Sequence, residues 1–211
     1  HPNNPLIFFK NPECLSNIKS FSLPQFSNNI HHEIELVFQI CKSGKNIKVN
    51  EIKEYVSHIA LGIDFTARDI QTEYKAKGYP WSFSKNFDNS APISKLIEIE
   101  KFNDINNINF SLFKNKKLIQ KGNSNLMIYN INFLLEYISK FITLQKGDFL
   151  FSGTPEGVGN IKKGDRVATL MGKSKEYIIT LLAIWRIGAV HVPLFTAFST
   201  PAITLRVNGS N

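Results

Sequence analysis

The sequence predicts a mixed α/β fold that is mostly β. Short apolar runs rich in β-branched and aromatic residues recur between segments that contain Asn and Gly, which is typical of strands. One longer stretch instead carries apolar residues at the 3.6-residue period of an amphipathic helix. With 43% hydrophobic residues and 17 Phe among 211 residues, the chain can bury a core, and its length favours one domain while allowing two.

The expected strands follow from local composition. Residues 31–41 contain no Gly or Pro and are rich in β-formers, and residues 58–64 form an apolar run that ends in an acid. Further strands are expected at 97–102, 109–113, 117–121 and 149–152, with a hairpin across 114–116 and an Asn-rich loop at 103–109.

Three helices are expected from their caps and apolar stripes. Asn50 is placed to cap a short helix that runs to about Ser57. Thr66 is placed to cap a longer helix, which runs to about Lys77 and is ended by Gly78. Asn123 or Ser124 would open the third helix, whose apolar stripe comprises Ile131, Leu134, Leu135, Ile138 and Ile142.

The first expected strand offers two carboxylates on one face. Residues i and i+2 of a strand point the same way, so Glu33 and Glu35 share a face while Ile34 and Leu36 share the other. A hard cation such as Mg²⁺ or Mn²⁺ neutralises paired carboxylates through oxygen ligands. The alternative is a solvated acidic strand face.

A second group of polar residues follows the strand at 58–64. Asp64 ends that strand, and Arg68 and Gln71 fall at i and i+3, on one face of the next helix. A carboxylate beside a cation at a helix start indicates a site for an anionic substrate. In the simpler interpretation Asp64 is a turn residue and Arg68 pairs with Asp69 or Glu73.

Four motifs in order resemble the fumarylacetoacetate hydrolase family, and most closely its acylpyruvate hydrolases and oxaloacetate decarboxylases. The resemblance covers roughly residues 5–167, and its motifs are 32–35 (HEIE), 64–71 (DFTARDIQ), 78–81 (GYPW) with Lys85, and 152–155 (SGTP) with 157–159 (GVG). It implies the family's rolled β-sheet core with flanking helices, and a homodimer.

The resemblance also implies roles for individual residues. Glu33, Glu35 and Asp64 correspond to the three metal-binding carboxylates, usually for Mg²⁺, with Mn²⁺ as the other candidate. Lys85 corresponds to the family's lysine near the substrate. Arg68, Gln71 and Thr154 correspond to substrate-binding positions.

The function implied is divalent-metal-dependent cleavage of a C–C bond in a small, anionic 2-oxo acid. The metal would stabilise an enolate, which serves acylpyruvate hydrolysis and oxaloacetate decarboxylation alike. Two alternatives stay open: a keto–enol tautomerase, and a catalytically impaired protein that binds metal and oxo acid.

The family's hydrolases carry a His-x-x-Glu pair on a lid helix upstream of the segment that matches residues 5–10, where it activates water. His1 and Asn4 do not reproduce that pair, and we interpret His1 as a truncation point or a disordered terminus. We therefore expect hydrolysis to be affected more than metal binding.

The composition changes near residue 168. Residues 1–168 contain 20 Asn and 19 Lys, whereas residues 169–211 contain 2 of each. The tail is similar to an early fragment of an acyl-CoA synthetase of the adenylate-forming type, without that family's phosphate-binding loop. We therefore expect a catalytic domain at 1–167 and a segment of foreign origin at 168–211. We do not expect adenylation activity from this segment.

Charge and cysteine content limit the other classes of function. The net charge of +8 comes from scattered lysines, with only four Arg, so no nucleic-acid partner is expected. The apolar stretch at 177–195 contains Arg186 and is expected to form a buried helix and a strand rather than a membrane span. The two cysteines, Cys14 and Cys41, suit a reducing cytoplasm, and no signal peptide is visible.

Overall fold

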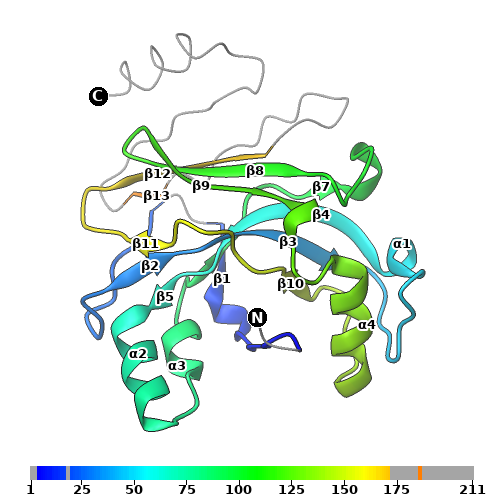
Figure 1. Cartoon of the computed structure of the whole chain (residues 1–211), viewed down its shortest axis with the longest axis horizontal. Helices are drawn as coiled ribbons and strands as arrows, with labels where there is room; N and C mark the ends of the chain where they lie inside the picture. Colours follow the sequence, from blue (N-terminus) through cyan, green and yellow to red (C-terminus); the bar gives the residue numbers. More distant parts are fainter. Residues whose placement is uncertain (1–3, 18–19, 172–184, 187–211) are drawn as a thin grey trace.

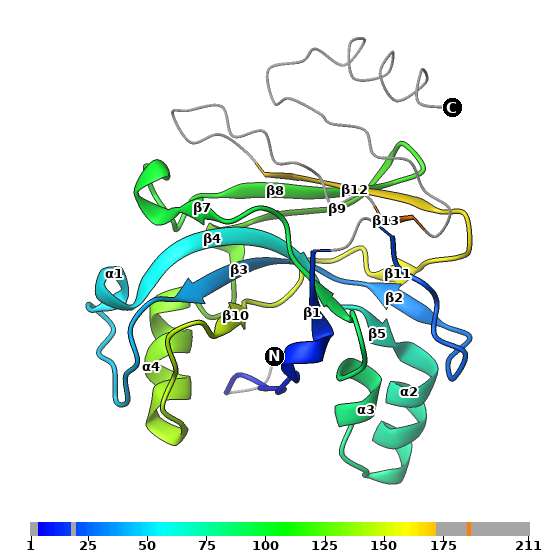
Figure 2. The same ribbon diagram turned by 180° about the vertical axis from the view of Figure 1, so that it is seen from behind.

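The structure is a computed structural model that describes residues 4–17, 20–171 and 185–186. In this part of the chain, mostly antiparallel strands form the centre of the molecule and short helices flank them (Figures 1 and 2). The mixed, mostly β fold expected from the sequence is confirmed.

The central sheet is antiparallel throughout. Its strands, in spatial order, are β10 (Phe149–Phe151), β3 (Ile34–Ile40), β4 (Val56–Ile63) and β7 (Ile97–Glu98). The two middle strands are buried along most of their length, and Leu36, Phe38 and Leu61 belong to the main hydrophobic core. Burial on both faces explains why these strands are near-continuous apolar runs.

A second, smaller sheet continues the same two chain segments. It contains β11 (Gly159–Asn160), β2 (Ile30–His32) and β5 (Thr66–Ala67). The strand expected at 31–41 is therefore divided into β2 and β3 at Glu33, and its partner is divided between β4 and β5. Ile34 faces Ile63 on one side of the division and His31 faces Thr66 on the other, so the pairing register is unchanged across it.

A third sheet carries the expected hairpin. β8 (Asn109–Lys114) and β9 (Lys117–Asn123) are joined through Asn115 and Lys116, whose φ angles of 50° and 73° match a two-residue turn with left-handed residues. β12 (Arg166–Met171) pairs with β8, and β13 (Trp185–Arg186) pairs with β12. A separate parallel pair joins β1 (Leu15–Ser16) to β6 (Ala91–Pro92).

The helices are short, and one expected cap is wrong. They are α1 (Ile52–Tyr55), α2 (Arg68–Lys77), α3 (Ser82–Lys85) and α4 (Ile131–Phe141), with 3₁₀ turns η1 (Pro12–Cys14), η2 (Ile99–Lys101) and η3 (Ser124–Leu126). Gly78 ends α2 with φ of 68°, as expected. Thr66 does not cap α2, because it pairs within β5 and its hydroxyl donates to the Asp64 carbonyl over 3.3 Å.

Other boundaries also differ from the expectation. α1 follows Glu51 rather than Asn50 and stops at Tyr55, because β4 takes over at Val56. The third helix begins at Ile131, seven residues after Ser124. Its N-cap is Asn130, whose side chain accepts a hydrogen bond from Phe133 N over 2.9 Å. The strand expected at 97–102 ends after two residues and continues as η2.

The elements are arranged in layers. α2 and α3 lie below one end of the central and second sheets and α4 below the other, with the N-terminal segment between them, while the third sheet lies on the opposite side (Figures 1 and 2). No helix among the described residues is both long and apolar enough to cross a bilayer. Most of the helix and strand expected at 177–195 lies outside the described residues.

Candidate active site

Three buried carboxylates meet where the central and second sheets join. Glu33 lies between β2 and β3, Asp64 follows β4, and Glu35 lies on β3. Each residue is less than a tenth exposed, and one oxygen of each lies within 4.8 Å of the others. The prediction that Glu33 and Glu35 share a face is confirmed, and the alternative of a solvated acidic face is wrong.

Three cationic side chains surround the carboxylates. Lys85 Nζ, at the end of α3, donates to Glu33 Oε2 over 2.6 Å and to Asp64 Oδ2 over 2.5 Å. Lys10 Nζ lies 2.9 Å from Asp64 Oδ1, and Arg68 Nη2 donates to Glu33 Oε1. All of these ion pairs go to Glu33 and Asp64, whereas Glu35 accepts from the Gly153 amide.

The electrostatics differ between the carboxylates and the lysine. Burial, followed by repulsion from Asp64, raises the pKa of Glu35 to about 8, although Lys85 and the Gly153 amide oppose the rise. Burial alone would lower the pKa of Lys85, but attraction to Asp64 and Glu33 outweighs it and raises the pKa. Lys85 therefore stays charged at neutral pH, whereas Glu35 without a bound cation stays largely protonated.

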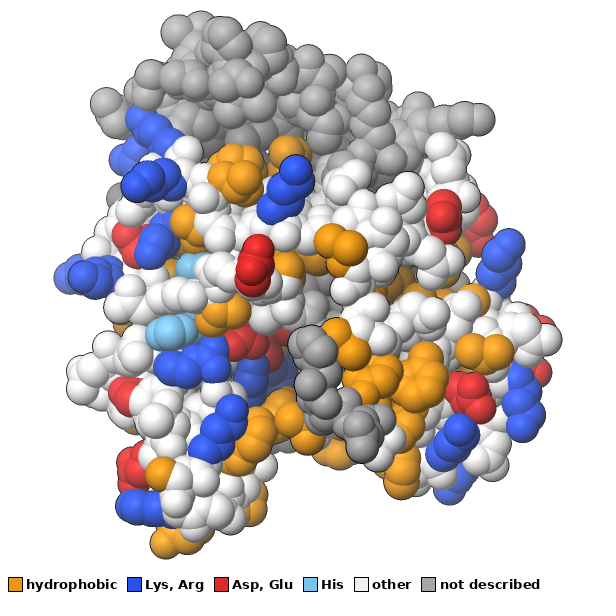
Figure 3. Space-filling view, viewed as in Figure 1, with side chains coloured by type: hydrophobic (Ala, Val, Ile, Leu, Met, Phe, Trp, Pro, Cys, Tyr) orange, Lys and Arg blue, Asp and Glu red, His pale blue; other side chains and the backbone are white. Residues whose placement is uncertain are grey.

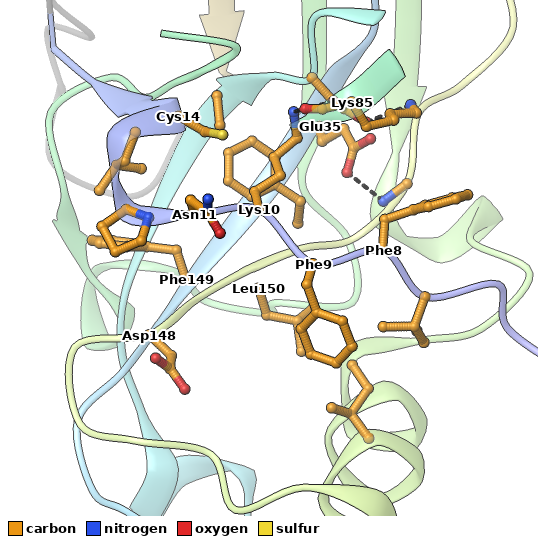
Figure 4. A pocket seen from close by; sticks show the side chains of 18 of the residues that line it. Phe8, Phe9, Lys10, Asn11, Cys14, Glu35, Lys85, Asp148, Phe149 and Leu150 are labelled. Atoms are coloured by element: carbon orange, nitrogen blue, oxygen red, sulfur yellow. Dashed lines mark hydrogen bonds and ion pairs between the residues drawn. The ribbon is translucent and has the colours of Figure 1, made fainter. Parts of the chain in front are cut away.

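The carboxylates lie at one end of a cavity of about 520 Å³. Figure 4 shows Glu35 and Lys85 together there, with Phe9 and Leu150 farther along the wall. Thr154 also lines the cavity, and the neighbouring Gly153 amide donates to Glu35 Oε2 over 2.6 Å. Acidic and basic side chains gather in a hollow of the face seen in Figure 3.

Arg68 and Gln71 are held beside the site. Arg68 Nη1 donates to Gln71 Oε1 over 2.6 Å, but neither residue belongs to the lining of the cavity. Arg68 pairs with Glu33 and not with Asp69 or Glu73, because Asp69 accepts from Ser27 and Asn28 while Glu73 pairs with Lys77. Direct contact of Arg68 and Gln71 with a substrate stays a prediction.

Two polar residues of the site were missed by sequence reasoning. Lys10 is 54 residues from Asp64, and Gln120 lies on β9, where it contacts His32 and Thr154. For Lys10 the available signal was its place at the end of the first matched segment. For Gln120 the only sequence signal was a polar residue in an expected strand. The structure shows that this residue is only 2% exposed.

The three histidines among the described residues do not contribute to the carboxylate cluster. His31 hydrogen-bonds Asn29, His32 hydrogen-bonds Gln120 and His58 hydrogen-bonds Ser57. The only group in the described residues that satisfies the geometry of a metal site consists of the three carboxylates. A site made of carboxylate oxygens can bind a hard cation without a histidine ligand.

The cluster fits a hard divalent cation. Its donors are carboxylate oxygens, which Mg²⁺ and Mn²⁺ prefer. Asp64 Oδ1 is buried and accepts no hydrogen bond from the part of the chain that the structure describes, where its contact with Lys10 is an ion pair without hydrogen-bond geometry. A buried carboxylate oxygen that lacks a hydrogen bond, at the end of a cavity, could bind a cation in place of its ion pair with Lys10.

Known proteins resemble this chain over most of its length. The family model for the C-terminal part of fumarylacetoacetate (FAA) hydrolase matches residues 1–181, and a model for AMP-binding enzymes matches residues 158–211. The mitochondrial oxaloacetate decarboxylase of Dictyostelium discoideum is 39% identical over 77% of this chain and 76% of its own length. The mitochondrial oxaloacetate tautomerase FAHD1 of Bos taurus is 37% identical over 79% of this chain and 76% of its own length.

Solved structures show the same fold. A fumarylacetoacetate hydrolase family protein from Yersinia pestis has a TM-score of 0.79 at 34% identity, covering 82% of this chain and 81% of that one. Fumarylpyruvate hydrolase from Pseudomonas aeruginosa, solved with Mn²⁺ and pyruvate, has a TM-score of 0.76 at 32% identity, covering 80% and 75%. The chain therefore belongs to the fumarylacetoacetate hydrolase family of enzymes.

Proposed function

We propose that this protein cleaves or isomerises a small 2-oxo acid with the help of a divalent cation held by Glu33, Glu35 and Asp64. The observation that carries the proposal is the buried carboxylate cluster, with one oxygen of Asp64 free of hydrogen bonds, at the end of a cavity. Relatives named for oxaloacetate and fumarylpyruvate chemistry support the substrate class.

A bound Mg²⁺ or Mn²⁺ would supply Lewis-acid polarisation of the 2-oxo acid and stabilise negative charge on its oxygen. The protein's own residues prepare the site for this. Lys85 holds Glu33 and Asp64 in place through one oxygen of each, and Arg68 holds the second oxygen of Glu33. Gly153 fixes Glu35 through its backbone amide. These contacts leave Oε1 of Glu35 for a cation, and Oδ1 of Asp64 for a cation that competes with Lys10.

Lys85 and Thr154 are placed to act on the substrate itself. Both line the cavity, and Lys85 is charged at neutral pH, so it can stabilise an anionic carboxylate or enolate oxygen. Thr154 offers a hydroxyl on the same wall. Arg68 and Gln71 complete the proposed substrate-binding set. Arg68 acts through its contact with Glu33 and Gln71 through Arg68, or both act directly if the substrate reaches them.

A single experiment can distinguish the candidate reactions. Purified protein with Mn²⁺ or Mg²⁺ is given oxaloacetate or acetylpyruvate, and NMR follows CO₂ loss, acetate release and keto–enol exchange separately. We expect pyruvate from oxaloacetate, with faster keto–enol exchange as the second candidate, because relatives of comparable identity are named for each. Asp64→Asn is the matched inactive control.

The proposal fails if no reaction occurs and if oxalate, a mimic of the enolate, does not bind in the presence of Mn²⁺. Oxalate binding without turnover would identify a catalytically impaired binding protein.

Two further proposals concern assembly and the tail. We infer a homodimer, since apolar side chains on α4 and the N-terminal segment are exposed, among them Phe141 at 68% and Phe9 at 66% (Figure 3). The division into 1–167 and a foreign segment at 168–211 is supported by the match at 158–211, although β12 continues in the sheet through Met171. Light scattering tests the homodimer. For the foreign segment at 168–211 we expect no ATP binding. The cytoplasmic location stays a prediction.

A further inference from the structure

Gln120 uses its whole side-chain amide to join three parts of the site. Its Oε1 faces His32 Nδ1 at 2.9 Å and accepts from Ile34 N over 3.2 Å. Its Nε2 donates to Thr154 Oγ1 and to the Pro155 carbonyl, each over 2.9 Å. The side chain is 2% exposed, so these bonds are sheltered from water.

The backbone of β9 directs this amide toward the site. The register between β8 and β9 shifts after Leu112, which pairs with Gln120, while Phe113 pairs with Leu118. Ile119 is therefore the additional residue of a β-bulge, a feature that re-aims neighbouring side chains. The loop that carries Thr154 then passes so close that a Cβ on Gly157 would lie 2.1 Å from the Ile119 carbonyl.

The orientation of the amide is determined by partners that have only one role. The Ile34 amide can only donate, and the Pro155 carbonyl can only accept. Oε1 must therefore face Ile34 and Nε2 must face Pro155. It follows that His32 carries its proton on Nδ1, and that Thr154 Oγ1 accepts a hydrogen bond from Gln120.

This leaves the hydrogen of the Thr154 hydroxyl available. Among the described residues Thr154 donates to no partner, and it lines the cavity that contains the three carboxylates. We propose that Gln120 is a positioning residue that makes Thr154 a hydrogen-bond donor toward an oxygen of the bound anionic substrate. The inference rests on the proposed function for the identity of that substrate.

Substitutions at position 120 can test this, because they change whether the side chain donates a hydrogen bond to Thr154 or accepts one from it. In Gln120→Glu an oxygen replaces Nε2, so the side chain accepts the Thr154 hydrogen and removes it from the substrate. In Gln120→Met the hydroxyl keeps its hydrogen but loses its fixed direction. Thr154→Val removes the donor, and Thr154→Ser retains it.

We expect Gln120→Glu and Thr154→Val to raise KM for the oxo acid about 10-fold or more, as for a lost bond to a charged group, with little change in kcat. Gln120→Met should raise KM less, and Thr154→Ser should resemble the parent protein. Because Gln120 acts through Thr154, the double variants Gln120→Glu/Thr154→Val and Gln120→Met/Thr154→Val should be no worse than Thr154→Val alone.

Ser124→Ala is the matched structural control. Ser124 follows β9 and joins it to the preceding segment by bonds to Ile108 N and the Ile105 carbonyl, both 2.8 Å. Its loss should lower the melting temperature without changing KM. If Gln120→Glu does not fold, the cycle with Gln120→Met and Thr154→Val decides the question.

Two results would overturn the proposal. One is a Gln120→Met KM equal to that of the parent, or effects that add in the double variants. The other needs no turnover: two-bond ¹H–¹⁵N correlation spectra should show His32 protonated at Nδ1, and a proton on Nε2 would reverse the amide assignment. Failure of the parent protein to bind oxalate with Mn²⁺ would instead contradict the proposed function, while the His32 spectrum would still test Gln120.

Discussion

The backbone amide of Asp64 donates to the carbonyl of Glu33 over 2.8 Å, at the point where both chain segments pass from one sheet to the next. Two carboxylates 31 positions apart in sequence are thereby fixed side by side without depending on their side-chain contacts. Glu35 joins them from two residues farther along β3. Because the site is built into paired backbone, it should survive substitution of single ligands, which makes the following predictions measurable.

Glu35→Gln should weaken Mn²⁺ binding by at least about 10-fold, because an amide oxygen replaces a charged ligand while the shape is kept. Titration calorimetry measures the affinity. Glu136→Gln, on the surface of α4, is the control and should bind Mn²⁺ as the parent does. Equal affinities for the two variants would exclude Glu35 as a ligand.

The stability of the metal-free protein should fall as pH rises. The folded protein holds the Glu35 proton up to a pKa of about 8, whereas an unperturbed glutamate has a pKa of 4.5, so between these values the folded state binds more protons than the unfolded state. This contribution is fully present below about pH 4.5 and is lost as pH rises through 8. Melting temperatures measured across this range test it.

Added Mn²⁺ should reverse that trend, since it replaces the proton on Glu35. The stabilisation by Mn²⁺ should therefore grow from pH 6 to pH 9, and Glu35→Gln should abolish the dependence. A pH-independent effect of Mn²⁺ in the parent would argue against ionisation of Glu35 on binding.

Lys10→Met should separate stability from metal affinity. Lys10 lies beside Asp64 Oδ1 and donates to Ser90 Oγ over 2.9 Å, so its loss should destabilise the metal-free protein by roughly 2–3 kcal/mol. Removal of a nearby positive charge should at the same time strengthen Mn²⁺ binding. Denaturant unfolding and calorimetry measure the two effects.

Lys53→Met on the surface is the control for Lys10→Met and should change neither quantity. If Lys10→Met weakened Mn²⁺ binding, Lys10 would be acting as a support for the ligands and not as a competing charge.

Gly157→Ala should be more harmful than Gly153→Ala. Both glycines have φ near 95°, which is strained for alanine. A Cβ at Gly153 meets no atom of the described residues within 4 Å, whereas at Gly157 it meets the Ile119 carbonyl at 2.1 Å. The strain costs each variant about 1–3 kcal/mol, and Gly157→Ala adds the clash. Similar melting temperatures would show that the loop can move away from β9.

Local sequence determined most of the elements and part of the site. Alternating and apolar runs located the main strands, Gly78 ended α2, and the period of Ile131, Leu134 and Leu135 identified α4. The spacing of Glu33 and Glu35 fixed their common face because the strand period is two. Element ends were less predictable. Thr66 pairs within β5 and does not cap α2, α1 begins after Glu51 and not after Asn50, and Asn123 caps only the 3₁₀ turn η3.

Only the tertiary structure decided which residues complete the site. Lys10 and Gln120 come from a loop and a bulged strand in two parts of the chain, and no local pattern relates them to Glu33 or Asp64. Lys85 was expected from its motif, but its contacts with both carboxylates were not. These side chains meet because burial of the three carboxylates requires compensating charges and hydrogen bonds at that place. The sequence by itself specified the acidic pair and its neighbours in order, whereas packing of distant segments determined their charge balance, the orientation of Thr154 and the shape of the cavity.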